Sequence, residues 1–201
     1  MYTDKRLVTL KKISAVKRNF LLLVLLINSF AFAQTITSAE MDTSLPPMVA
    51  MRKTTIGKPF GAFSATGDSV ITTEAFKGKT VFVNFWFESC APCITELDGL
   101  NTLYKQTKNN ANFLFVSFTF EPIEKLKTLR EKYGLFYPVY HIEAKGCQRL
   151  NRGLGFPTNV LVDSAGKINH LVFGGAKDKK SAEEFLHNEF YQKIIALSEQ
   201  H

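Results

Sequence analysis

The sequence is poor in the residues that build covalent or metal-held scaffolds, with three cysteines and four histidines among 201 residues. Three cysteines are too few for a domain stapled by several disulfides, and too few for a zinc site made of four thiolates. A mixed site would need a second ligand cluster, and Cys147 forms none with His141, His170, His187 or His201. We therefore expect no metal and no other cofactor.

An excess of charge is also missing once the first 33 residues are set aside. The net charge is +7, but residues 1–33 hold six basic residues and one acidic residue, which is +5 of that total. The remainder holds 19 basic and 17 acidic residues, or +2. A nucleic-acid-binding protein would need a basic patch in its folded part, and no clear one appears. We expect no nucleic-acid partner.

Residues 1–33 have the features of a secretory signal peptide. A basic segment precedes the apolar run 20–27, and residues 31–33, Ala-Phe-Ala, match an A-x-A cleavage site. The apolar stretch is about 14 residues long, shorter than the roughly 17–25 that a membrane span needs. An uncleaved anchor is the alternative. We predict export to an oxidising, periplasmic or other extracytoplasmic compartment, with tethering to the membrane if the leader stays attached.

The domain boundaries follow from composition. Residues 34–55 are rich in Thr, Ser, Met and Pro, which predicts a linker or a loosely attached segment. The folded domain is predicted to cover residues 56–201. No internal repeat or low-complexity tract divides it.

A buried strand that turns into an amphipathic helix is the central feature of this domain. Residues 81–87 form an almost unbroken apolar run, typical of a strand buried on both faces. Cys90 and Cys93 follow, with two residues between them. A helix is predicted over 91–108, since Ile94, Leu97, Leu100 and Tyr104 recur at helical spacing.

The remaining elements predict an α/β fold with a mixed sheet. An N-terminal β-hairpin is expected from residues 60–63 and 70–72, and alternating βα units predict a central parallel pair. Further strands are predicted at 113–120, 136–141, 159–162 and 167–173, and further helices at 121–133, 145–154 and about 179–197. The result is a central mixed sheet flanked by helices on both faces, with the hairpin as an extension.

The C-x-x-C motif has two main interpretations, a metal half-site or a redox pair. The second ligand cluster that a metal would need is absent, whereas the βα context of a redox pair is present. Cys90 would lie at the helix N-terminus, where free N–H groups and the dipole stabilise a thiolate. Pro92 suits the first helical turn. A redox pair is the favoured interpretation.

Pro157 is the second signal, because it stands directly before the predicted strand 159–162. A proline there can be an ordinary trans residue in a loop, which is the common case, or a cis peptide at the start of a strand. The residues alone leave both possibilities open.

Four spaced patterns resemble the thioredoxin fold, and more narrowly the TlpA/ResA-type extracytoplasmic thiol–disulfide oxidoreductases. They are Gly-Lys-Pro-x-x-x-Phe (57–63), Phe-Lys-Gly-Lys-x-Val-x-Val-Asn-Phe-Trp (76–86), Cys-x-Pro-Cys-x-x-Glu (90–96) and Gly-Phe-Pro-Thr-x-x-x-Val-Asp (155–163). They occur in the family's order, and the resemblance covers residues 56–197.

The resemblance assigns roles to individual residues. Cys90 becomes the exposed nucleophile and Cys93 the buried resolving thiol, and the two form a Cys90–Cys93 disulfide in the oxidised protein. Glu96 matches an acidic residue that influences thiol ionisation, although a solvated first-turn carboxylate is an equal alternative. Pro157 matches the family's cis-proline. Its substrate groove is expected to include Phe156, Pro92 and Trp86, with Trp86 packed beneath the cysteines.

Three positions depart from the family pattern. Asn84 stands where cytoplasmic thioredoxins carry a buried Asp, so a proton acceptor must lie elsewhere, with Glu96 as the candidate. Ser89 replaces a common Trp, which removes an apolar wall, and Asp98 replaces a common Pro. Cys147 is expected to be a buried free cysteine, with a second resolving thiol as the alternative.

The resemblance implies a monomeric enzyme that reduces disulfides of exported proteins, for example during cytochrome c maturation. Its electrons would come from a membrane thiol donor of the DsbD/CcdA type. The alternatives are an oxidase or isomerase with the opposite electron flow, and a Cu(I) metallochaperone using the two thiolates. A peroxidase would need a Thr-x-x-Cys setting, which is absent.

Overall fold

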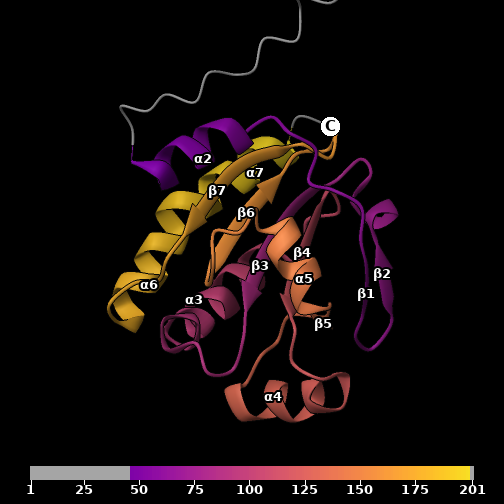
Figure 1. Cartoon of the computed structure of the whole chain (residues 1–201), viewed down its shortest axis with the longest axis vertical. Coiled ribbons are helices and arrows are strands. Elements are labelled where there is room, and N and C mark those ends of the chain that lie inside the picture. The colour runs from indigo at the N-terminus through magenta and orange to yellow at the C-terminus, as the bar shows by residue number, and fades with distance from the viewer. Residues whose placement is uncertain (1–45, 200–201) are drawn as a thin grey trace, which may run out of the picture. The chain divides into compact units, whose positions relative to one another are not determined.

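A seven-stranded sheet with the order β2-β1-β5-β4-β3-β6-β7 organises the fold (Figure 1). The computed structural model describes residues 46–199; the predicted signal peptide 1–33 and most of the predicted linker lie outside this range. The strands are β1 Ser64–Thr66, β2 Val70–Thr72, β3 Thr80–Trp86, β4 Phe113–Thr119, β5 Val139–His141, β6 Thr158–Val162 and β7 Ile168–Phe173.

The sheet is mixed, as predicted. β3 runs parallel to β4 from the Thr80–Phe113 pair to the Trp86–Thr119 pair, and antiparallel to β6. All seven residues of β3 are buried. This burial explains the apolar run in the sequence, because a central strand covered on both faces has no side for polar residues.

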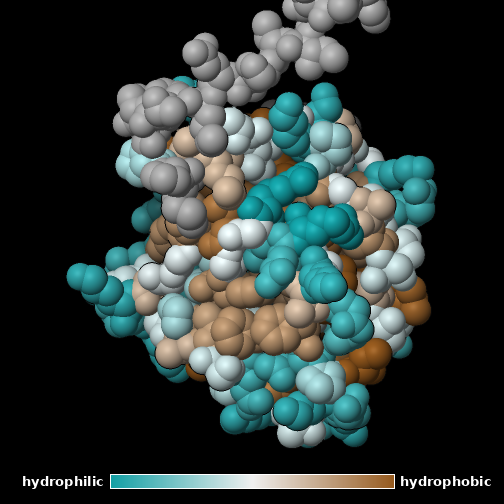
Figure 2. Space-filling model, in the orientation of Figure 1, coloured by the Kyte–Doolittle hydropathy of each residue, from teal (hydrophilic) through white to brown (hydrophobic). Residues whose placement is uncertain are grey.

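The helices are α2 Pro47–Thr55, α3 Ala91–Thr107, α4 Leu126–Tyr133, α5 Ala144–Leu150, α6 Lys179–Leu186 and α7 Gln192–Ser198. Short 3₁₀ segments occupy Thr73–Phe76 and Ile123–Lys125, and a π-helical segment occupies His187–Tyr191. None of the helices within residues 46–199 has the length and apolar content that crossing a bilayer requires. The face drawn in Figure 2 is largely polar, with an apolar patch near the ends of β3 and β4.

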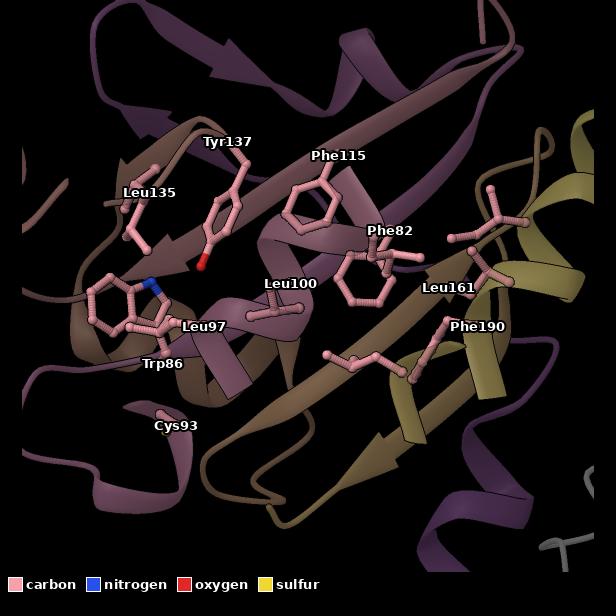
Figure 3. Close-up of a cluster of buried hydrophobic side chains, with 14 of the residues drawn as sticks. Phe82, Trp86, Cys93, Leu97, Leu100, Phe115, Leu135, Tyr137, Leu161 and Phe190 are labelled. Atoms are coloured by element: carbon pink, nitrogen blue, oxygen red, sulfur yellow. The ribbon is translucent and has the colours of Figure 1, made fainter. Parts of the chain in front are cut away.

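Two cores lie on opposite faces of the sheet, and β3 contributes to both. Phe82 and Trp86 point to the core under α3 and the C-terminal helices, whereas Val81, Val83 and Phe85 point to the core under α5 and the N-terminal segment. Figure 3 shows Phe82 meeting Leu100 and Phe190 in the first core. Successive side chains of β3 therefore pack alternately against the helices on one face of the sheet and on the other.

Two predictions about the N-terminal part need correction. The last residues of the predicted linker 34–55 form α2, whose Ala50 is buried and whose Arg52 lies 3.4 Å from His170 Nδ1 on β7. The first hairpin strand lies at 64–66 and not at 60–63. Phe60 is instead buried in the core, so its apolar character reflects packing and not strand pairing.

The C-terminal helix differs from the uninterrupted helix predicted over 179–197. A π-helical segment at His187–Tyr191 separates α6 from α7. Phe190 in this segment packs edge-on against Phe82, with ring centroids 5.0 Å apart. The segment is thereby held against the centre of the sheet, a tertiary contact that helical periodicity alone does not reveal.

Candidate functional site

The two cysteines lie where β3 gives way to α3. Cys90 is the N-cap residue of α3, and its sulfur accepts a hydrogen bond from the Cys93 backbone N–H at 3.3 Å. The two sulfur atoms are bonded, with an S–S distance of 1.97 Å and 5.2 Å between the Cα atoms. Cys90 is 6% exposed and Cys93 1%. Both cysteines are therefore largely buried, and Cys90 is the more exposed of the two.

The loop before β6 lies beside the cysteines because of strand register. Phe85 near the end of β3 pairs with Thr158 at the start of β6, so residues 155–157 reach the same edge of the sheet as Cys90. The Phe156–Pro157 peptide bond is cis, as the resemblance implies. The Gly155 carbonyl accepts hydrogen bonds from the Thr158 hydroxyl at 2.7 Å and from Asn151 Nδ2 at 2.9 Å, which fixes the loop.

The loop after β7 lies against both the cis-proline loop and the C-x-x-C turn. The Gly174 N–H donates to the Pro157 carbonyl at 2.9 Å. A Cβ atom on Gly175 would lie 2.5 Å from the Pro92 Cβ and 3.1 Å from the Pro92 carbonyl oxygen. Only glycine allows this approach, so Gly175 lets the loop pack directly against the C-x-x-C turn.

Three aromatic rings meet at the same edge of the sheet. Phe87 lies 5.1 Å from Phe120 and 5.2 Å from Phe156, and Phe120 lies 5.6 Å from Phe156, measured between ring centroids. All three are partly exposed. Of the three rings, only Phe156 was predicted to line the site. The available signal for Phe87 and Phe120 was an aromatic residue directly after each of two neighbouring parallel strands. The three rings give the site an apolar wall despite Ser89.

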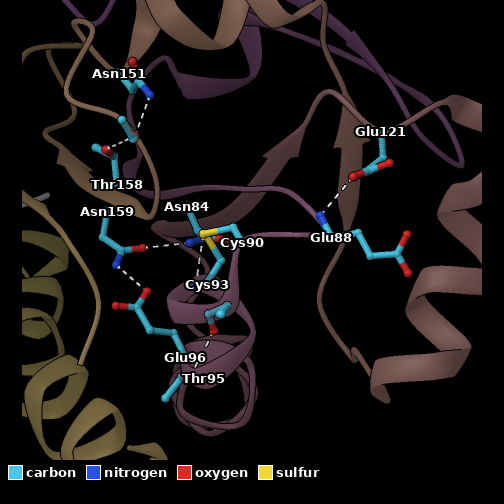
Figure 4. Close-up of a disulfide and its surroundings, with 12 residues drawn as sticks. Asn84, Glu88, Cys90, Cys93, Thr95, Glu96, Glu121, Asn151, Thr158 and Asn159 are labelled. Carbon is cyan, nitrogen blue, oxygen red and sulfur yellow. Dashed lines mark hydrogen bonds between the residues drawn. A yellow bond between two sulfur atoms is a disulfide. The ribbon is translucent and has the colours of Figure 1, made fainter. Parts of the chain in front are cut away.

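Glu96 lies one helical turn after Cys93 and is fully buried (Figure 4). Its Oε2 accepts a hydrogen bond from Asn159 Nδ2 at 3.0 Å, while its Oε1 has no hydrogen-bond partner within residues 46–199. Burial raises the pKa of Glu96 from its ordinary 4.5 to about 7, although the Asn159 hydrogen bond pulls it downward. The alternative of a solvated carboxylate at this position is wrong.

The segment between β3 and Cys90 is held by hydrogen bonds with two side chains of neighbouring segments. The Glu88 backbone N–H donates to Glu121 Oε1 at 2.9 Å, and Lys132 Nζ donates to Glu88 Oε1 at 2.8 Å (Figure 4 draws the first bond). The hydrogen bond from Lys132 lowers the pKa of Glu88. These contacts link the approach to Cys90 with the end of β4 and with α4.

Two residues from the sequence analysis do not face the site. Trp86 is fully buried, so it supports the cysteines from below and does not line a groove, which corrects that expectation. Cys147 is also fully buried, in the core on the opposite face of the sheet from Cys93. Burial raises the pKa of Cys147 to about 12. Its position is that of a packing residue and not of a second resolving thiol.

Between residues 46 and 199, no three His, Cys, Asp or Glu side chains gather in a group that could hold a metal ion.

Known proteins share both the sequence pattern and the fold. The chain matches the AhpC/TSA family model over residues 56–171. It is 32% identical over 138 residues to the thiol-disulfide oxidoreductase ResA of Bacillus anthracis, covering 67% of this chain and 78% of that protein. The thioredoxin domain of a Bacteroides vulgatus thiol-disulfide oxidoreductase superposes with a TM-score of 0.54 at 25% identity, covering 65% of this chain and 96% of that one. A thiol:disulfide interchange protein of Chlorobium tepidum TLS shares the fold, with a TM-score of 0.56, 22% identity, and 71% and 97% coverage.

The buried carboxyl group of Glu96 makes stability depend on pH. The pKa of Glu96 is raised from 4.5 to about 7 in the folded state. Between these two pH values the folded state therefore holds a proton that the unfolded state has released. Its stabilising contribution is therefore complete below pH 4.5 and is lost as pH rises through 7. We expect Glu96→Gln to remove this loss. The free energy of unfolding of the variant minus that of wild type should therefore be about 3 kcal/mol larger at pH 8 than at pH 4.5.

Urea unfolding of the oxidised protein between pH 4 and pH 8.5 measures this difference. Asp98→Asn is the control, because Asp98 is an exposed carboxylate on the same helix. Parallel pH curves for wild type and Glu96→Gln would contradict the assignment.

Proposed function

This chain belongs to the AhpC/TSA family and is a thiol-disulfide oxidoreductase, and from this premise we propose that its Cys90–Cys93 pair reduces disulfide bonds in exported proteins. The supporting observation is the position of the pair. Cys90, the more exposed of the two cysteines, lies at the start of α3 beside the cis-proline loop and the aromatic rings. A substrate disulfide that reaches this edge meets a thiolate and an apolar surface together.

The reaction transfers two electrons from the dithiol to the substrate. The Cys90 thiolate attacks one substrate sulfur, the substrate S–S bond breaks, and the departing sulfur takes up a proton. Cys93 then loses its proton and attacks Cys90 in the mixed disulfide. The second substrate sulfur leaves and is protonated, and the enzyme retains the Cys90–Cys93 disulfide.

We assign the proton from Cys93 to Glu96. The two residues are three positions apart on α3, so their side chains lie on the same face of the helix. Both are buried, which leaves few routes for a proton to water. A carboxyl pKa of about 7 suits a group that must both accept and return a proton near neutral pH. Asn84, at the position of the thioredoxin Asp, cannot serve as a base.

The enzyme must be reduced again after each turnover. Because the cycle ends with the Cys90–Cys93 disulfide, a second dithiol has to attack Cys90 from outside. A membrane thiol donor of the DsbD/CcdA type fits this requirement in a compartment without a glutathione pool. The chain would act as a monomer, and apocytochromes c awaiting haem attachment are one class of substrate.

Substitution of the cysteines separates their roles. Cys90→Ser is expected to lower insulin-disulfide reduction to the uncatalysed background, because the serine hydroxyl is not ionised at neutral pH. Cys93→Ser should instead accumulate a mixed disulfide through Cys90, visible as a mass increase that dithiothreitol reverses. Cys147→Ser, a change at the buried cysteine outside the site, is the control and should keep its activity. Full activity of Cys90→Ser would eliminate the mechanism.

The redox potential of the pair decides the direction of electron flow. We expect equilibration with thiol buffers to give a value at or below about −230 mV, in the range of reducing members of this fold. A value near about −120 mV, which is that of a strong periplasmic oxidant, would replace the reductase with an oxidase. The measurement uses the oxidised and reduced full chain, with the two forms separated after acid quenching.

The proposed location depends on residues 1–33. A fusion of residues 1–45 to alkaline phosphatase should be active in a bacterial host, because that enzyme acquires its disulfides only after export. Leu23→Arg, which places a charge in the apolar run 20–27, should abolish this activity. Mass spectrometry of the exported chain distinguishes cleavage after Ala33 from an intact anchor. Equal phosphatase activity of the Leu23→Arg fusion would contradict export by this segment.

A further inference from the structure

A row of polar side chains crosses the otherwise apolar centre of the sheet. Asn84 of β3 is the register partner of Ser117 on β4 and of Asn159 on β6. Their side chains are buried, at 1%, 0% and 1% exposure. Even-numbered residues of β3 face α3, so this row lies beneath the helix that carries Cys93 and Glu96. Three neighbouring strands thus bring polar groups to one point under the helix.

The hydrogen bonds of this row all run in one direction. The Ser117 hydroxyl donates to Asn84 Oδ1 at 3.0 Å, Asn84 Nδ2 donates to Asn159 Oδ1 at 2.9 Å, and Asn159 Nδ2 donates to Glu96 Oε2 at 3.0 Å. Figure 4 shows the last two bonds leading to the Glu96 carboxyl group. An ionised carboxylate can only accept, so it fixes the orientation of Asn159, then of Asn84, and leaves Asn84 Oδ1 for Ser117.

We propose that Asn159, supported by Asn84 and Ser117, is a positioning residue that holds Glu96 Oε2 and leaves Glu96 Oε1 free to exchange a proton with the thiol pair. The inference depends on the proposed function, which makes Glu96 the proton acceptor of the reaction. Each bond in the row polarises the next, so the row strengthens the final N–H donor. The Asn159 N–H favours the ionised form of Glu96, whereas burial favours its neutral form, so the two act in opposite directions on the Glu96 pKa.

Two other titratable side chains near α3, those of Asp98 and Tyr137, form no hydrogen bond with Glu96. Asp98 of α3 pairs with Lys179 of α6 at 2.7 Å, on the surface. The Tyr137 hydroxyl is fully buried; burial, and the charges of Glu96 and Asp98, raise its pKa. Within residues 46–199, Asn159 donates the hydrogen bond that reaches the Glu96 carboxyl group. Burial raises the pKa of Glu96, and the Asn159 hydrogen bond lowers it.

The direct test is the titration of Glu96 in the oxidised protein, where the cysteines do not titrate. Carbon-13 NMR of the carboxyl carbons, assigned by comparison with Glu96→Gln, gives its pKa. Asn159→Leu removes the donor and is expected to raise the Glu96 pKa by about one to two units, the value of a hydrogen bond to a charged group. Asn159→Asp, which is isosteric and keeps an acceptor for Asn84, should raise it as well.

Two further variants separate positioning from structural support. Ser117→Ala, at the far end of the row, should give a shift in the same direction of about one tenth to one third of that size. Asn101→Leu is the matched control, because Asn101 is a buried asparagine of α3 that bonds the Gly134 carbonyl and the Phe136 N–H instead. It should lower stability and leave the Glu96 titration unchanged. An unchanged Glu96 pKa in both Asn159 variants would overturn the proposal.

The reduced protein supplies the second readout. In Asn159→Leu, the pH dependence of the thiol–disulfide exchange rate should shift to higher pH together with the Glu96 pKa. In a protein that already carries Glu96→Gln, the Asn159→Leu substitution should cause no such shift. A shift that persists without the carboxylate would show that Asn159 acts only through the structure. Loss of the reductase assignment would leave the titration in the oxidised protein intact, so the two proposals can fail separately.

Discussion

The complete burial of β3 between two cores is the constraint on which the rest of the structure depends. A strand covered on both faces fixes its register with β4 and β6, and that register decides what meets at its carboxyl end. Cys90 follows from this strand, the cis-proline loop arrives beside it, and the rings of Phe87 and Phe120 extend two parallel neighbours. The two loops of the site are held by hydrogen bonds and by close packing against the C-x-x-C turn, which fixes their positions.

The same burial creates an electrostatic cost that the proposed chemistry uses. Removing Glu96 from water destabilises its carboxylate and brings its pKa to about 7, which lowers stability at neutral pH. A neutral residue at this position would relieve that cost, but in the proposed mechanism the proton of Cys93 would then lose its acceptor. Stability and proton transfer therefore make opposite demands on one side chain, as is common at functional sites.

Much of this arrangement could be predicted from local patterns. The apolar run 81–87 and the helical spacing after Cys93 predicted the central strand and helix, because burial and periodicity are local properties. The roles of Gly175 and Asn159 could not be predicted in this way, since each depends on contact between segments distant in the sequence. The π-helical segment was missed for the same reason, because the packing of Phe190 against Phe82 is a tertiary contact.

Asn84 gains a different meaning once its neighbours are known. Taken alone, it is a thioredoxin-like strand position that has lost its carboxylate. In the structure its amide connects Ser117 to Asn159, and Asn159 reaches the carboxylate on α3. The acidic group lies on the helix and not on the strand, while the strand position still contacts it through one intermediate side chain. An amide suits this place better than an acid, because it accepts from one side and donates to the other, and it adds no second buried charge beside Glu96.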